Sequence, residues 1–189
     1  MVTAPRSLDS TDLRASAQLA RGLFALAGLT YCLIVLGALV RAHGAGLACP
    51  DWPLCFGNLI PEFDFKIAFE WSHRALAASV GILFSVIAVL SLRRPGLRER
   101  MWRGLLVTAL ILAVQIVLGG RTVLELLAYW TVTSHLVAGN AFALALVLLG
   151  RRLASFEAEA GDASLDARPD QRLATTTAGM LLGIQIVLG

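Results

Sequence analysis

Uncharged, mostly apolar segments divide this chain at regular intervals. Four runs cover residues 22–40, 75–92, 104–120 and 126–150, and a fifth at 173–189 is still apolar when the sequence stops. None has the strict alternation of a membrane β-strand. A helix rises about 1.5 Å per residue, so each run crosses, or nearly crosses, roughly 30 Å of hydrocarbon. The pattern predicts an all-α membrane protein, with a four-helix transmembrane bundle and the start of a fifth span.

Charged residues are few, and their placement predicts the orientation in the membrane. They make up 15% of the chain, whereas soluble domains carry about a quarter. Arginines crowd the 93–103 turn and the Arg151-Arg152 pair, while the 42–65 segment has no Lys or Arg. The positive-inside rule places the arginine clusters and the N-terminus in the cytoplasm and 42–65 outside. This membrane explanation of the basic balance leaves no reason to expect nucleic acid as a partner.

These boundaries define four regions. We predict a cytoplasmic leader at 1–21, a four-helix transmembrane unit at 22–152 with an outer loop at 42–65, a cytoplasmic linker at 153–172 and a truncated fifth span at 173–189.

A short repeat suggests internal duplication. The tetrapeptide Ile-Val-Leu-Gly occurs at 34–37, 116–119 and 186–189, each time at the outer end of an outward-running span. The first and last copies are about half of an eight-span protein apart, and internal repeats are common in membrane folds. We therefore interpret the four-helix unit as the first of two. The alternative is chance recurrence in apolar segments.

Two histidines lie inside the predicted spans at similar depth. His73 is near the outer end of the second span, and His135 is in the outer third of the fourth. Two neutral imidazoles on different helices can serve as axial ligands of haem iron. Alternatively, each is a lone polar group hydrogen-bonded across helices. We expect the third histidine, His43, to be a solvated loop residue.

Glu70 lies one helical turn before His73 and leaves two interpretations open. It could act on protons or orient a ligand beside the haem iron. It could also be a rim carboxylate paired with Arg74 or Lys66.

Cysteines and other polar residues add further candidates. Cys49 and Cys55 in the outer loop suggest a disulfide in an oxidising compartment, with a thiol redox role left open. Cys32 is expected to be buried. Polar residues inside the spans are expected to bond across helices: Gln115, Thr131, Thr133, Ser134 and Asn140. Arginines at outer span ends could meet haem propionates or extend to lipid headgroups: Arg41, Arg74 and Arg121.

Together these motifs resemble the haem A synthase family. The resemblance covers roughly residues 22–150, and its motifs keep the family's order and spacing. The matching segments are Gly37–Cys55, Glu70–Arg74, Gln115–Val123 and Thr133–Leu136.

The resemblance implies a fold, an activity and a site. The family has two similar four-helix units, each with a histidine pair, and it oxidises the C8 methyl of haem O to a formyl group, giving haem A for cytochrome c oxidase. Carried over, His73 and His135 are axial ligands of haem iron, Arg74 contacts the haem, Glu70 is the catalytic carboxylate, and Cys49 and Cys55 form the outer-loop disulfide.

Further expectations concern the rest of the protein. The haem b cofactor belongs to the second unit, so this chain is expected to be a fragment, or a half-size form that pairs with another chain. His43 replaces a small hydroxyl residue of the family pattern and is left out of the site. Haem O is the expected substrate in a bacterial inner membrane. Candidate partners are haem O synthase, cytochrome oxidase assembly factors and a second copy. A bis-histidine b-type cytochrome that only transfers electrons is the alternative function.

Overall fold

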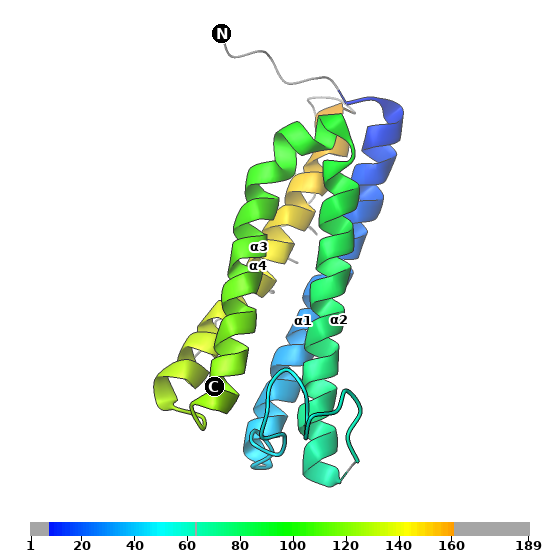
Figure 1. Cartoon of the computed structure of the whole chain (residues 1–189). Coiled ribbons are helices and arrows are strands. Elements are labelled where there is room, and N and C mark those ends of the chain that lie inside the picture. Colours follow the sequence, from blue (N-terminus) through cyan, green and yellow to red (C-terminus); the bar gives the residue numbers. More distant parts are fainter. Residues whose placement is uncertain (1–7, 63, 161–189) are drawn as a thin grey trace.

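The computed structural model describes residues 8–62 and 64–160 of the chain. This part forms four long helices, α1 (Ser10–Ala42), α2 (Phe65–Leu92), α3 (Pro95–Leu124) and α4 (Tyr129–Ala160). They run alternately up and down in one bundle (Figure 1). Each contains a segment long and apolar enough to cross a membrane. The predicted all-α membrane bundle is confirmed.

The helices extend beyond the apolar runs because polar caps define their ends. The Asp9 carboxylate accepts a hydrogen bond from the Asp12 N–H at 2.7 Å, so α1 begins at Ser10. The predicted leader at 1–21 is therefore helical from Ser10 onward. Likewise α4 continues to Ala160, into the predicted 153–172 linker. The rest of that linker and the predicted fifth span lie outside the described residues.

The turns between helices follow the same logic. The Asp64 carboxylate accepts from the Ile67 N–H at 2.8 Å and caps the start of α2. Pro95 opens α3, where a missing N–H costs no intrahelical hydrogen bond. Only residues 93–94 separate α2 from α3, and only 125–128 separate α3 from α4. The 43–64 loop is thus the long connection, and it lies at the same end of the bundle as 125–128.

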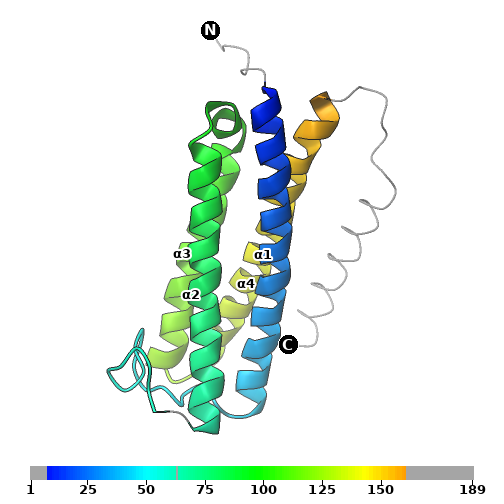
Figure 2. The same ribbon diagram turned by 90° about the vertical axis from the view of Figure 1, so that its right-hand side faces the viewer.

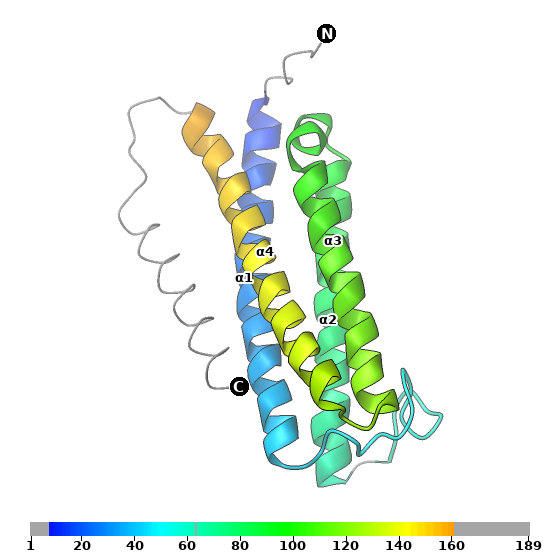
Figure 3. The same ribbon diagram turned by 90° about the vertical axis from the view of Figure 1, so that its left-hand side faces the viewer.

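Each helix packs against its neighbours in the order α1, α2, α3, α4 and back to α1. The most extensive contacts join α1 to α4, α3 to α4 and α1 to α2, whereas the backbones of α2 and α4 do not approach each other closely. The views in Figure 2 and Figure 3 show the two hairpins, α1–α2 and α3–α4, lying against each other. The two predicted histidine-bearing helices, α2 and α4, are therefore at opposite corners.

The tightly packed core occupies the half of the bundle away from the long loop. Leu23, Leu97, Leu146 and Leu153 are completely buried there. The Phe84 and Phe142 rings meet edge to face, with centroids 5.6 Å apart, a favourable arrangement for aromatic rings. The loop half instead holds the histidines and several buried polar groups. The bundle is thus closely packed with apolar side chains in one half and contains the histidines and other polar groups in the half next to the loop.

This division predicts how the helices respond to truncated side chains. Leu146→Ala removes a fully buried side chain (0% exposed) and should lower the free energy of unfolding by about 2–5 kcal/mol, because a cavity replaces dispersion contacts. Leu144→Ala, on the same helix but 45% exposed, is the matched control and should change little. Unfolding in a detergent titration measures both. Equal effects would contradict the placement of the core.

Candidate functional site

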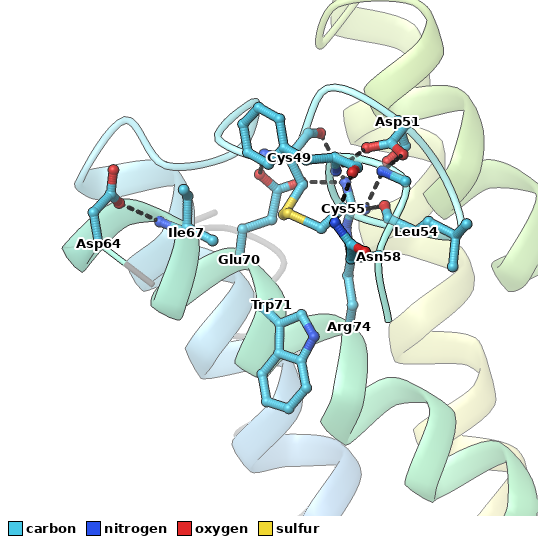
Figure 4. Close-up of a disulfide and its surroundings, with 12 residues drawn as sticks. Cys49, Asp51, Leu54, Cys55, Asn58, Asp64, Ile67, Glu70, Trp71 and Arg74 are labelled. Carbon is cyan, nitrogen blue, oxygen red and sulfur yellow. Dashed lines mark hydrogen bonds and ion pairs between the residues drawn. A yellow bond between two sulfur atoms is a disulfide. The ribbon is translucent and has the colours of Figure 1, made fainter. Parts of the chain in front are cut away.

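The outer loop is folded tightly on itself. Cys49 and Cys55 form a disulfide, as predicted, and both residues are buried. Cys55 and Asn58 exchange two backbone hydrogen bonds of 3.0 and 3.1 Å. The Asp51 carboxylate accepts from the Phe56 and Gly57 N–H groups, at 2.7 Å each. Figure 4 shows these contacts around the disulfide.

Asp51 makes the closed loop sensitive to acid. The Gly57 N–H, followed by the Phe56 N–H, stabilises the charged carboxylate and holds the pKa of Asp51 below its usual value. A lowered pKa means that this contribution is complete above the pKa of the unfolded chain. It is lost as the pH falls through the lower value in the folded loop.

An ion pair on α2 holds this loop. Arg74 donates to Glu70 Oε1 at 2.5 Å, and the other carboxylate oxygen, Oε2, accepts from the Cys49 N–H at 2.9 Å. Glu70 is 3% exposed. A buried carboxylate is costly unless it is both paired and hydrogen-bonded, and here both conditions are met. The structure therefore places Glu70 with Arg74 rather than Lys66.

Arg74 extends the anchor across the loop. Its Nη1 donates to the carbonyls of Asp51 and Leu54 at 2.7 Å each, and its Nη2 also donates to the Cys49 carbonyl at 3.1 Å. Both terminal nitrogens thus bind the loop, and Nη2 also binds Glu70. We call Glu70, Arg74 and these loop groups the loop anchor. Contact of Arg74 with a haem propionate stays a prediction, and it would compete with these bonds.

Two further contacts seat the loop on the bundle. The Trp71 indole N–H donates to the Leu59 carbonyl at 2.7 Å. The Trp52 ring lies so close to α3 that a Cβ added at Gly120 would be 3.1 Å from it. The loop connects α1 to α2 in sequence. Through Trp52 it also contacts α3, and so it joins α2 to the second hairpin.

His73 lies against a glycine of the preceding helix. A Cβ added at Gly37 of α1 would be 2.9 Å from His73 Cε1, closer than real Cβ atoms approach. Gly37 therefore forms a seat for the ring, and a side chain at position 37 would force the imidazole to move.

The second hairpin repeats this arrangement. A Cβ added at Gly119 of α3 would be 3.0 Å from His135 Cε1, and Gln115 lies one turn before Gly119. The glycines end two copies of the Ile-Val-Leu-Gly string, at 34–37 and 116–119. The sequence showed this repeat, but its role as a histidine seat emerges only from the packing.

The two imidazoles are a suitable donor set for haem iron. They come from different hairpins, each near the loop end of its helix. Nδ1 of His73 and of His135 is buried without a hydrogen-bond partner among the described residues. That part of the chain has no cluster of three or more His, Cys, Asp or Glu to bind a bare ion. Haem iron needs only two such ligands from the protein.

Other predicted residues lie elsewhere. His43 ends α1 at an exposed position and stacks on Phe69, with ring centroids 5.0 Å apart. Cys32, predicted to be buried, is exposed on the bundle surface, because that side of α1 faces away from the neighbouring helices. Arg121 pairs with Glu125 at 2.6 Å and lies over the Trp130 ring. Arg41 is also exposed.

The polar residues inside the spans divide into two groups. Thr131 and Asn140 were expected to bond across helices, but each donates to a backbone carbonyl of its own segment, Ala128 and Leu136. Gln115 does reach another helix: its amide nitrogen lies 3.5 Å from His135 Nε2.

Comparison with known proteins adds the family. The model of the cytochrome oxidase assembly protein family matches residues 20–64 and 60–189. The chain belongs to this family. A "Heme A synthase" of Shewanella oneidensis is 32% identical over 178 residues, which cover 85% of this chain and 52% of that protein. One from Symbiobacterium thermophilum is 36% identical over 101 residues, covering 51% of this chain and 31% of the relative.

A protein with a different name is also similar to part of this chain. A "Protoheme IX farnesyltransferase" of Haloarcula marismortui is 37% identical over 89 residues, which are 47% of this chain and 19% of that protein. The chain spans about half the length of the Shewanella relative and less of the others. No solved structure matches the chain.

The loop anchor predicts a distinct effect of Arg74→Ala. The substitution frees three loop carbonyls and leaves Glu70 buried without its cation, which costs about 3–5 kcal/mol for a buried pair. We expect faster proteolysis within residues 43–64 of the purified protein. Arg121→Ala removes a similar but exposed ion pair and should not change the cleavage rate. Equal rates in wild type and Arg74→Ala would contradict the anchor.

Proposed function

We propose that this chain is the histidine-bearing first unit of a haem A synthase, an oxidoreductase that converts the C8 methyl of haem O to a formyl group. The observation that carries the proposal is the pair of equivalent seats that present His73 and His135 from two hairpins. Relatives named "Heme A synthase" support the same reaction. They do not favour a cytochrome that only transfers electrons.

The two imidazoles would hold haem iron from opposite sides. The iron, when bound, supplies the redox chemistry of the reaction. The residues of this chain fix the position of the ligands: Gly37 and Gly119 allow the rings to approach the helix backbones. The buried, unpaired nitrogen on each ring gives it a reason to accept a further partner.

Glu70 has two roles to reconcile in this proposal. It lies three residues before His73 on α2, hence on the same helix face, and so remains the candidate catalytic carboxylate. In the structure both its oxygens are occupied by Arg74 and the Cys49 N–H. To exchange a proton with substrate, it would have to release one of these partners. Its other contribution, holding the loop over the end of the bundle, would limit the access of water.

The remaining assignments follow from the family and the charge distribution. We propose the inner membrane of a bacterium as the location, with the N-terminus and the arginine-rich α2–α3 turn in the cytoplasm. A second unit would hold haem b. Similarity to part of a protein named "Protoheme IX farnesyltransferase" supports a farnesylated haem as substrate and haem O synthase as a partner. Assembly factors and a second copy are further proposed partners.

Haem binding tests the ligand assignment directly. His73→Ala and His135→Ala should each remove the low-spin haem absorption bands of the purified protein, because each variant lacks one axial ligand. His43→Ala is the matched control, since this histidine is exposed and outside both seats. Unchanged spectra in both site variants, or absence of haem from the wild type, would rule out axial ligation.

Product analysis separates the two roles of Glu70. The protein would be expressed in cells that make haem O but no haem A, and the extracted haems chromatographed. We expect Glu70→Gln to abolish haem A formation and Arg74→Ala, which disturbs the same loop but keeps the carboxylate, to retain part of it. Glu125→Gln, at an exposed ion pair, is the control. Equal losses in Glu70→Gln and Arg74→Ala would show that Glu70 acts only through the loop.

A further inference from the structure

The two histidine seats are equivalent in position but differ at one residue. Leu33 and Gln115 each lie four residues before the seat glycine, Gly37 in the first hairpin and Gly119 in the second. The side chain at this position is apolar in the first hairpin. In the second hairpin it is an amide, so only the His135 seat has a side-chain hydrogen-bonding group at this position.

The Gln115 amide is placed against the His135 ring. Its nitrogen lies 3.5 Å from His135 Nε2, at the long limit of a hydrogen bond. Its oxygen is buried and has no partner among the residues that the structure describes. Burial of an unpaired amide oxygen is unfavourable, so this side chain has unused hydrogen-bonding capacity next to a proposed iron ligand.

A glycine on α4 makes room for this amide. A Cβ added at Gly139 would be 3.0 Å from the Gln115 amide nitrogen. Gly139 lies one turn after His135, so both residues of α4 are on the face that meets α3. The amide is therefore enclosed between the imidazole and the α4 backbone, and its position is limited by packing.

We propose that Gln115 is a positioning residue that sets the orientation of the His135 imidazole and makes the two axial ligands inequivalent. The inference rests on the proposed haem ligation. A glutamine suits the task because either end of its amide can face the ring. In one orientation the NH₂ group donates to an unprotonated imidazole nitrogen. If the amide rotates by half a turn, its oxygen instead accepts from an imidazole N–H. The His73 seat has leucine at this position, and a leucine side chain offers no hydrogen bond.

Hemin titration of the whole chain, purified in detergent, tests this inference. Gln115→Met keeps the length of the side chain but removes both hydrogen-bonding atoms. We expect it to weaken hemin binding about 10- to 100-fold, as is typical when a group supporting a metal ligand is lost, and to alter the ferric low-spin electron paramagnetic resonance signal, which reports imidazole orientation. Leu110→Met, on the same helix but 58% exposed, is the matched control and should bind hemin as wild type does.

A second pair of variants tests the proposal in case Gln115→Met does not fold. Gly139→Ala adds a methyl group against the amide and should shift the same resonance signal. Gly28→Ala, with nothing within 4 Å of its added Cβ, should not. Wild-type affinity and spectrum in Gln115→Met would overturn the role of Gln115 while leaving haem ligation intact. If Gln115→Met does not fold, an unshifted signal in Gly139→Ala would overturn that role instead. Absence of hemin binding by the wild type would overturn both proposals.

Discussion

The loop end of this bundle depends on the ion pair between Glu70 and Arg74. Two charges removed from water are stable only where other groups complete their hydrogen bonds. Here the Cys49 N–H and three loop carbonyls do so. Those loop groups are in place because the disulfide and Asp51 close the loop on itself. The ion pair, the disulfide and the start of α2 are therefore one interdependent structure.

The same constraint explains why the bundle is divided. Close packing of leucine and phenylalanine holds the four helices together at the end with the short α2–α3 turn. The other end cannot be packed in this way if it is to present imidazoles, and there the loop joins the hairpins instead. Glycines at 37 and 119 bring each ring onto a neighbouring backbone. A closely packed half thus supports a polar half in which the two imidazoles lie against helix backbones.

Much of this could be predicted from sequence because hydropathy and charge act locally. The apolar runs predicted the four spans. The arginine clusters and the spacing of the residues predicted the disulfide and singled out the two histidines. Helix ends were missed because caps such as Asp9 act outside the apolar segments. The burial of Cys32 was predicted wrongly, since residue type does not reveal which side of a helix faces its neighbours. The Ile-Val-Leu-Gly repeat was visible, yet its glycines gained a meaning only when the rings were found against them.

The proximity of the loop anchor to His73 has a mechanistic consequence. Glu70 and Arg74 lie on either side of His73 within little more than one turn of α2, so the loop anchor and the proposed ligand share one helix segment. A carboxylate that is both a structural anchor and a candidate proton carrier cannot change its charge without disturbing that anchor. If Glu70 takes up a proton, its attraction to Arg74 weakens and the loop carbonyls lose part of their support. Under the proposed haem ligation, proton movement at this position would be linked through the ion pair to the helix segment that holds His73.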